Sequence, residues 1–353
     1  MTAPRPVLVA PDKFKSTLSA DEVARAIGRG LLGAGVERVE LLPVADGGEG
    51  SMEALVRAGG GTFVAADATD PLGRPVSAAF GMLADGRTAI VEVAQASGLW
   101  RLAPEERDAW GASSRGTGEL IRAAIEAGAR RVVVTAGGSA TTDGGRGALE
   151  ALGATFTSGG ADLSALETGS RGVKLLVACD VSNPMCGPGG AAATFAPQKG
   201  ADAETVERLE ERLRDWAALA RRSTGRDPSG QPMAGAAGGL AGGLWAFAGA
   251  ELHAGSVLVL DTLRFDERAR AARAVCTGEG SLDEQTLAGK AVFEVATRCR
   301  QGGIPCYAVV GRDELDDFGK RLLNIEVSQA SRGERPASAS DVELAARRLA
   351  KRI

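Results

Sequence analysis

Three apolar strand patterns in this chain run directly into loops of glycine and carboxylate residues. Residues 39–44 lead into Asp46-Gly-Gly-Glu-Gly50, residues 132–136 into the glycine-rich stretch 137–145, and residues 274–277 into Gly-Glu-Gly-Ser-Leu-Asp (278–283). Glycine permits positive φ angles and lets a ligand approach backbone N–H groups. An aspartate among such glycines can bind Mg²⁺ or accept a proton. The three loops predict one convergent polar site that handles an anion.

Length and charge narrow the class of protein. A chain of 353 residues is too long for one ordinary core, so two domains are expected. Lys plus Arg number 41 against 45 Asp plus Glu, which leaves no basic stripe for nucleic acid and no polybasic membrane patch. No apolar run approaches the roughly 20 residues of a membrane span, and the N-terminus has no signal-peptide pattern. We expect no nucleic-acid partner and no membrane association.

Cysteine and histidine usage excludes several kinds of site. The five cysteines are odd in number and contain no Cys-x-x-Cys pair, which favours reduced thiols and a cytoplasmic location. The single histidine, His253, excludes a zinc site of the His-Glu-x-x-His type. Its neighbours predict the end of a helix, where a cation would act as a cap or lie at the surface.

The order of strand and helix patterns predicts an α/β fold. A strand over 7–10, a helix that begins with the capping box Ser19-Ala-Asp-Glu22, a strand over 39–44 and a helix over 51–58 indicate βαβ crossovers in a parallel sheet. Loops 11–18 and 46–50 then leave from the carboxyl edge, where open α/β sheets bind ligands. Further strands are expected at 88–93, 131–136 and 174–179, with helices at 116–127 and 202–222. Trp216 on the last helix is expected in the core, and the Gly/Ala-rich stretch 235–243 at a close helix contact or a ligand-facing turn.

The C-terminal part returns to the βαβ pattern. A strand is expected at 274–277, a helix at 291–302, a strand at 306–310 and a final helix capped by Ser340. The two ends of the chain resemble each other more than the middle. We therefore predict a discontinuous Rossmann-like parallel-sheet domain (1–65 plus 260–353) and a second, inserted α/β domain (66–259), with the active site in the cleft between them.

A dinucleotide-like motif is expected to be inert. Gly28-Arg-Gly-Leu-Leu-Gly33 matches G-x-G-x-x-G, but it lies at the C-terminal end of a predicted helix instead of between a strand and a helix. NAD(P) binding is not expected, and Gly30→Ala should be mild or slightly stabilising. No Walker motif is present, because Glu284 stands where the first glycine before Gly289-Lys290 should be.

The loop residues fit phosphoryl transfer. Asp143 and Asp283 are explained equally well as helix caps, but Gly-Gly-Glu-Gly separates Asp46 from any helix it could cap. Lys13 and Lys15 would share the sheet edge with Asp46 and suit phosphate or carboxylate oxygens. Asp180 and Asn183 form either a Mg²⁺ pair or an Asx turn. Acidic groups, lysines and glycine N–H groups are what phosphoryl transfer needs, and histidine is optional.

Seven ordered motifs resemble the bacterial glycerate kinases of the two-domain α/β type. They are Ala-Pro-Asp-Lys-Phe-Lys (10–15), Pro-Val-Ala-Asp-Gly-Gly-Glu-Gly (43–50), Gly-Thr-Gly-Glu-Leu-Ile (116–121), Gly-Gly-Ser-Ala-Thr-Thr-Asp-Gly-Gly (137–145), Cys-Asp-Val-Ser-Asn-Pro (179–184), Pro-Gln-Lys-Gly-Ala (197–201) and Thr-Gly-Glu-Gly (277–280). The resemblance implies phosphorylation of D-glycerate by ATP with Mg²⁺, usually at the 2-hydroxyl. Ser16, Thr142, Arg115 and Ser281-Leu282 depart from common family residues, which bears on substrate affinity.

Under this resemblance each loop residue receives an expected role. The catalytic residues are Asp46 as the leading base, Asp180 as the second candidate, and Lys13. Substrate binding falls to Lys15, Asp12, Gly47, Gly48, Glu49 and Gly50. ATP or phosphate binding falls to Gly137, Gly138, Ser139, Asp143, Lys199, Gly278, Glu279 and Gly280. The metal ligands are Asp180, Asn183 and Asp283.

Several alternatives stay open on the sequence. The product could be 3-phosphoglycerate instead of 2-phosphoglycerate. A Mg²⁺-dependent lyase or phosphatase acting on a small hydroxy acid would use the same acidic loops, and a non-enzymatic hydroxy-acid sensor would need only the binding groups. The domain that holds ATP and the choice between monomer and homodimer are also open.

Overall fold

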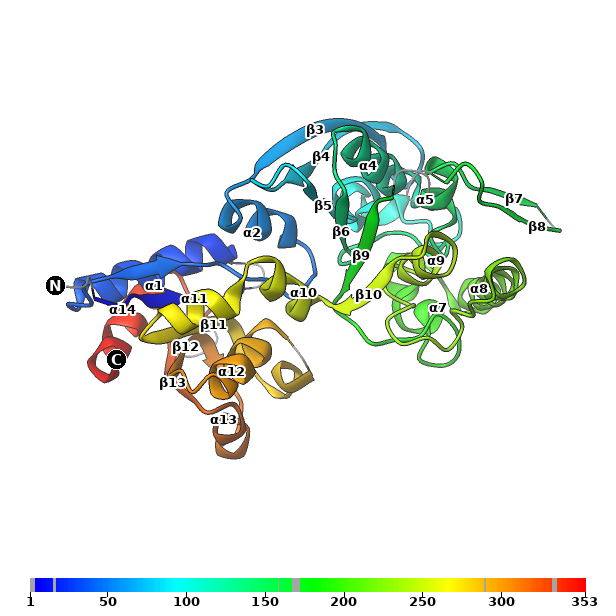
Figure 1. The fold of residues 1–353 in the computed structure, drawn as a ribbon. Coiled ribbons are helices and arrows are strands. Elements are labelled where there is room, and N and C mark those ends of the chain that lie inside the picture. Colours follow the sequence, from blue (N-terminus) through cyan, green and yellow to red (C-terminus); the bar gives the residue numbers. More distant parts are fainter. Residues whose placement is uncertain (1–3, 15–16, 158, 167–171, 289, 332–334) are drawn as a thin grey trace. The chain divides into compact units, whose positions relative to one another are not determined.

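The computed structural model describes residues 4–14, 17–157, 159–166, 172–288, 290–331 and 335–353. It divides into two compact units (Figure 1). Unit 1 consists of Met1–Asp46 and Ser256–Ile353, and unit 2 of Gly47–Gly255. The chain therefore passes from one unit to the other after Asp46 and again after Gly255.

Unit 1 contains a five-stranded sheet in which every strand pair is parallel. The strands are β1 (Val7–Val9), β2 (Val39–Leu41), β11 (Ala274–Leu282), β12 (Cys306–Asp313) and β13 (Ile325–Gln329), in the order β13-β12-β11-β1-β2. The chain moves outward from β1 in one direction and from β11 in the other. The β1/β11 pair is therefore the topological switch point, and ligands of doubly wound sheets bind outside the carboxyl ends of the strands there.

Helices cover this sheet and complete the core of unit 1. They are α1 (Ala20–Gly33), α11 (Phe265–Ala271), α12 (Ala291–Gln301), α13 (Asp317–Leu323), α14 (Ala339–Leu349) and the 3₁₀ turns η4 (Glu284–Ala288) and η5 (Ala350–Arg352), while α10 (Gly255–Thr262) begins at the last residue of unit 2. The expected capping box is confirmed, because Ser19 and Glu22 exchange hydrogen bonds at the start of α1. Helices α1 and α14 pack closely at Gly30, where an added Cβ would lie 2.4 Å from the Glu343 carbonyl oxygen.

Unit 2 contains a six-stranded mixed sheet whose strands follow chain order. They are β3 (Thr62–Thr69), β4 (Pro75–Met82), β5 (Thr88–Glu92), β6 (Arg131–Thr135), β9 (Lys174–Cys179) and β10 (Glu251–Ala254). β3, β4 and β5 pair antiparallel, whereas β5, β6, β9 and β10 are parallel. β7 (Thr155–Thr157) and β8 (Gly160–Asp162) form a separate hairpin. The loops after β5, β6, β9 and β10 thus leave from one edge of the sheet.

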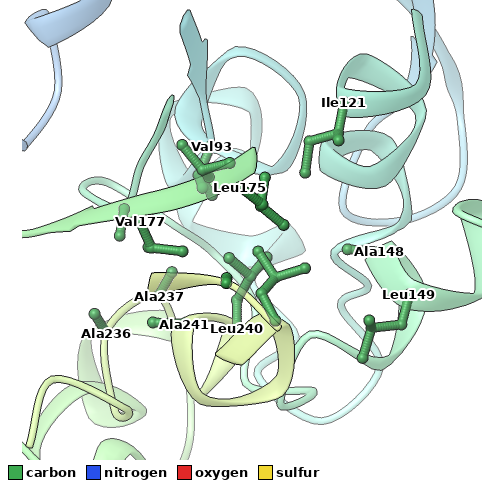
Figure 2. Packing of buried hydrophobic residues seen from close by; sticks show 14 of the residues in the cluster. Val93, Ile121, Ala148, Leu149, Leu175, Val177, Ala236, Ala237, Leu240 and Ala241 are labelled. Atoms are coloured by element: carbon green, nitrogen blue, oxygen red, sulfur yellow. The ribbon is translucent and has the colours of Figure 1, made fainter. Parts of the chain in front are cut away.

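Helices and the sheet of unit 2 share a large apolar core. The helices are α2 (Ser51–Ala58), α3 (Ala94–Ser97), α4 (Arg115–Glu126), α5 (Arg146–Ala151), α7 (Ala191–Phe195), α8 (Ala203–Thr224) and α9 (Leu240–Ala248), with the 3₁₀ turns η1 (Leu99–Arg101), η2 (Pro104–Glu106) and η3 (Pro197–Lys199). Figure 2 shows Leu175 and Val177 of β9 among side chains from α4, α5 and α9. Trp216 is in this core, as expected, and its rings pack near those of Phe156 and Phe247.

The first crossing between the units differs from the expected limit at residue 65. Segment 47–65 belongs to unit 2 because β3 pairs with β4 and because α2 packs against β4 and β5. Gly81 of β4 makes room for this helix, since a Cβ there would lie 2.1 Å from Val56 Cγ2. The second crossing, after Gly255, falls near the expected limit at 259.

Two local expectations were wrong and one is confirmed. The N-cap of α14 is Ser338 instead of Ser340, because Ser338 exchanges hydrogen bonds with Asp341. His253 lies on β10, next to Glu251, and not at the end of a helix. The glycines of the dinucleotide-like motif lie inside α1 or at its last residue, so the expected misfit of that motif is confirmed.

In the described residues, no helix has the length and apolar character needed to cross a membrane.

Candidate functional site

The carboxyl ends of the unit 1 strands surround a cavity of about 460 Å³. Residues after β1 and β2, at the ends of β11 and β12, and after β13 all line it, so it lies at the switch point of the sheet. The expected site residues that line this cavity are Asp12, Lys13, Asp46, Glu279, Gly280 and Asp283. Asp46 and residues of the loops 11–14 and 278–283 therefore meet at this cavity, whereas loop 137–145, which was expected at the same site, belongs to unit 2.

Buried carboxyl groups give this cavity unusual electrostatics. Burial, with repulsion from Asp46, raises the pKa of Asp12 to about 8, although its Oδ1 accepts a hydrogen bond from the Lys13 N–H. Burial also raises the pKa of Glu279 to about 7, with repulsion from Asp283 and Asp46, against a hydrogen bond from the Thr286 hydroxyl. Perturbed carboxyl groups in a cleft are typical of sites that bind cations or move protons.

Cationic side chains also line the cavity, and several of them were not among the site residues expected from the sequence. Lys290 Nζ lies 3.7 Å from Asp283 Oδ1, and Arg312 and Arg335 contribute guanidinium groups. Arg312 is the register partner of Ser281 across the β11–β12 pair. Ser331 completes this side after β13. The missed signal was weaker than in the three recognised loops, because residues 325–329 (Ile-Glu-Val-Ser-Gln) alternate apolar and polar residues before the sequence runs into Ser, Gly and charged residues.

Two glycines of unit 1, Gly278 and Gly311, are required by close contacts within the sheet. A Cβ at Gly278 would lie 2.2 Å from the Val309 carbonyl oxygen, and one at Gly311 would lie 2.3 Å from that of Gly280. The Gly278 carbonyl oxygen accepts a hydrogen bond from the Asp12 N–H and so joins β11 to the loop after β1. Lys15 lies outside the described residues.

In unit 2, loops 47–50 and 137–138 lie against each other. A Cβ at Gly137 would lie 2.5 Å from Gly48 Cα, and one at Gly138 would lie 3.4 Å from Glu49 Oε2. Gly47 has φ of +93°, and a Cβ there would lie 2.7 Å from Gly255 Cα. These close backbone approaches explain why the two loops are rich in glycine.

The start of α2 is held by a distant carboxylate instead of a local cap. Glu92, buried at the end of β5, accepts hydrogen bonds from the Gly50 N–H at 3.0 Å and the Met52 N–H at 3.1 Å. The Gly50 amide is therefore already engaged within the protein. No pattern near Gly50 reveals this, because Glu92 is 42 residues away.

The loop after β6 is held by several side chains. Asp143 accepts hydrogen bonds from the Ser114 N–H and hydroxyl and from the N–H groups of Gly145 and Gly147. Its carboxylate thereby joins the starts of α4 and α5. Lys199 is buried, and its Nζ donates to the Thr141 carbonyl oxygen at 2.6 Å and to Ser139 Oγ at 3.2 Å. Burial lowers the pKa of Lys199 to about 8.

The loop after β9 is more open. Asp180 is exposed directly after β9, and Asn183 is half-buried. The Asn183 Nδ2 donates to the Gly189 carbonyl oxygen at 2.7 Å, which closes the loop on itself. Asp180 and Asn183 belong to unit 2, whereas Asp283 belongs to unit 1.

A second cavity, of about 670 Å³, follows α8 in unit 2. Trp110, Arg208, Arg212 and Arg222 are among its lining residues, and none of them was expected to be functional. The guanidinium carbons of Arg208 and Arg212 lie 4.3 Å and 4.4 Å from the centre of the Trp110 ring.

The oxygen donors of both units fit Mg²⁺. This ion usually keeps several waters and binds one or two carboxylates together with substrate phosphates. In the described part of the chain, no group of three or more His, Cys, Asp or Glu side chains could hold a metal alone. The single carboxylate of Asp283, or Asp180 with the amide oxygen of Asn183, is a donor set of the size that Mg²⁺ uses with a bound nucleotide.

Known proteins resemble the chain over nearly its full length. The model of the glycerate kinase family matches residues 7–342. A glycerate kinase of Bacillus subtilis (strain 168) is 43% identical over 333 residues, which cover 88% of this chain and 86% of the relative. A glycerate 2-kinase of Escherichia coli (strain K12) is 40% identical over 331 residues, covering 89% and 86%.

A solved structure agrees with the fold described above. The crystal structure of a Salmonella typhimurium LT2 protein assigned as glycerate kinase 2 superimposes with a TM-score of 0.87 at 36% identity, covering 99% of this chain and 98% of that one. The predicted α/β class is confirmed by this match.

Proposed function

The chain belongs to the glycerate kinase family, and we propose that it transfers the γ-phosphoryl group of ATP to the 2-hydroxyl of D-glycerate. The products are 2-phosphoglycerate and ADP. The family match over residues 7–342 carries this proposal. The 2-hydroxyl is favoured because the Escherichia coli relative is named a glycerate 2-kinase.

The cavity of unit 1 supports the proposed chemistry. Phosphoryl transfer depends mainly on positioning and charge neutralisation, and this cavity combines Asp12, Asp46 and Glu279 with the cations Lys13 and Lys290. We propose that Asp46 accepts the proton of the attacking hydroxyl or orients it, with Asp180 as the second candidate. Lys13, Lys15 and backbone N–H groups of loop 47–49 would bind the carboxylate of glycerate.

The proposed contacts to phosphate come from groups of both units. We propose that Gly137, Gly138 and Ser139 offer donors to ATP, and that Gly278, Glu279 and Gly280 of unit 1 line the path of the transferred group. Mg²⁺ would neutralise charge on the phosphate oxygens. We propose Asp283, or Asp180 with Asn183, as its protein ligands. A cytoplasmic location fits this use of ATP, and all five cysteines are free thiols.

Product analysis tests the proposed activity. ADP release should require Mg²⁺, ATP and D-glycerate together. In a coupled assay, enolase alone should give a signal, because it consumes 2-phosphoglycerate directly. A signal that needs phosphoglycerate mutase as well would identify 3-phosphoglycerate as the product. Absence of ADP release with D-glycerate and other small hydroxy acids would reject the kinase function.

Asp46→Asn tests the proposed base. The change keeps the size of the side chain but removes its charge and its ability to accept a proton. We expect kcat to fall by roughly 10²–10⁴, the usual range for general acid–base groups, with a smaller change in the KM for glycerate. Asp21→Asn is the matched control, because Asp21 lies on α1 in an ion pair with Arg25, away from the cavity. If kcat of Asp46→Asn stays within about threefold of the parent, far outside that range, Asp180 becomes the leading candidate.

A further inference from the structure

Loop 137–143 is held on one side by cationic side chains from a single stretch of chain. Lys199, on η3, donates to the Thr141 carbonyl oxygen at 2.6 Å. Arg212, on α8, donates through Nη2 to the Thr142 carbonyl oxygen at 2.8 Å and through Nη1 to that of Trp110 at 2.8 Å. Two consecutive carbonyl groups of the loop are thus fixed by two positive charges.

Neither charge is neutralised by a direct partner. In the described residues, Lys199 and Arg212 take part in no ion pair, and burial lowers the pKa of both groups. The charge of Asp143 acts on both Lys199 and Arg212. Its carboxylate oxygens, however, accept hydrogen bonds from Ser114, Gly145 and Gly147 and not from these two cations. Burying cations without a paired anion is costly. An anion bound at this loop would offset that cost.

The geometry of the peptide bond fixes where the loop presents its donors. In a trans peptide the C=O and N–H groups point in opposite directions. Because the Thr141 and Thr142 carbonyl groups face Lys199 and Arg212, the N–H groups of Thr142 and Asp143 point away from these cations. Within the described part of the chain, neither N–H has a backbone acceptor.

Two hydroxyl groups in the same loop point to a ligand independently. Thr141 and Thr142 are fully buried, and among the described residues their Oγ1 atoms have no hydrogen-bond partner. Buried polar groups in proteins are nearly always hydrogen-bonded. The loop therefore combines uncompensated positive charge, directed N–H groups and unpaired hydroxyl groups.

We propose that loop 137–143 binds an oxyanion through its own N–H and hydroxyl groups, and that Lys199 and Arg212 are positioning residues behind it. They orient the peptide groups and supply positive charge without touching the ligand. Lys199 Nζ already donates to two acceptors within the protein, whereas the Thr141 and Thr142 hydroxyl groups have none among the described residues, which argues against direct contact of Lys199 with phosphate. This inference rests on the proposed kinase function, under which the oxyanion is the phosphate chain of ATP or the carboxylate of glycerate.

Kinetics of three variants with one control test the proposal. We expect Lys199→Met and Arg212→Met to raise the KM of the same substrate by about 10- to 100-fold, as for loss of a charge-assisted hydrogen bond, with a smaller change in kcat. Arg212→Lys should recover part of the effect. Arg208→Met is the control, because Arg208 stacks on the same Trp110 ring one turn earlier on α8, but among the described residues it donates no hydrogen bond to the loop. The substrate whose KM rises identifies the source of the oxyanion.

Thermal shift measurements supply a readout that does not depend on turnover. Inorganic pyrophosphate or D-glycerate should raise the Tm of the parent and of Arg208→Met, and the rise should be lost in Lys199→Met and reduced in Arg212→Lys. Unchanged KM values in folded variants, or no Tm rise of the parent with either probe, would overturn the proposal. An equal KM increase in Arg208→Met would place the anion in the α8 cavity and overturn it as well. If the parent shows the Tm rise but does not phosphorylate glycerate, the kinase function fails and the loop assignment stands.

Discussion

Asp12 should reduce the stability of the ligand-free protein near neutral pH. Burial, with repulsion from Asp46 and Glu279, raises its pKa from 3.8 to about 8. Between these values the folded protein keeps a proton that the unfolded chain releases. The free energy of unfolding therefore falls as the pH rises from about 4 to about 8, because the unfolded state binds fewer protons.

Asp12→Asn removes this penalty. At pH 7 the unfolded carboxyl group is about three pH units above its ordinary pKa, and each unit is worth about 1.4 kcal/mol. The upper limit of the penalty is therefore about 4 kcal/mol. Asparagine keeps the shape and the oxygen that accepts the Lys13 N–H. We expect Asp12→Asn to stabilise the ligand-free protein at pH 7 by about 1–4 kcal/mol and to change little at pH 4.

Urea unfolding of the parent and the variant at pH 4, 5.5 and 7 measures this difference. The stability gain should grow with pH, and Asp21→Asn on α1, away from the cavity, is the control. The variant should also lose kinase activity if Asp12 serves the proposed site. A variant that is less stable than the parent at pH 7 would refute the reasoning, because it would mean that Asp12 is ionised and held by Lys13 in the folded protein.

Two further predictions concern helix packing and the metal. Gly30→Ala should destabilise the protein by about 1–3 kcal/mol through overpacking, because its Cβ would lie 2.4 Å from the Glu343 carbonyl oxygen of α14. Gly33→Ala on the same helix has room for the added Cβ and should be neutral or stabilising by up to about 1 kcal/mol. Equal Tm values for both variants would contradict this prediction. Asp283→Asn should raise the Mg²⁺ concentration for half-maximal rate about tenfold or more. If only Asp180→Asn raises this concentration, the protein ligand of Mg²⁺ is in unit 2 instead.

The expectation that Gly30→Ala is mild was wrong for a reason outside the local sequence. Helix α1 was predicted correctly from its capping box and apolar spacing. The sequence near Gly30 cannot reveal that α14, more than 300 residues later, lies against this position. Intrinsic propensity favours alanine in a helix, but the contact with the Glu343 carbonyl oxygen outweighs that preference.

The cap of α14 and the position of His253 show a similar limit. Ser338 and Ser340 are each followed by an acidic residue three positions later, Asp341 and Glu343. Both pairs match a capping box, and the structure uses the first because Glu343 is bound by Arg29 and Arg347 instead. His253 lies on a strand because Glu251–Ala254 pairs with β9, a contact between distant segments.

Strand ends were the most predictable part of the site. Apolar runs followed by glycine and aspartate located the loops after β1, β2 and β11 in unit 1 and after β6 and β9 in unit 2, because parallel strands place their carboxyl ends at one edge of each sheet. The raised pKa values of Asp12 and Glu279 could not be predicted, since they depend on burial by several segments. The contacts of Lys199 and Arg212 with loop 137–143 were equally invisible, because they join residues about 60 and 70 positions apart.

The division between the units falls inside the motif that first suggested function. Element order alone placed it near residue 65, but the apolar face of α2 is buried in unit 2, so Asp46 belongs to unit 1 and Gly47 to unit 2. Neighbouring Cα atoms are held about 3.8 Å apart by the peptide bond. The proposed base and the first amide of the proposed carboxylate-binding loop are therefore kept together by covalent geometry.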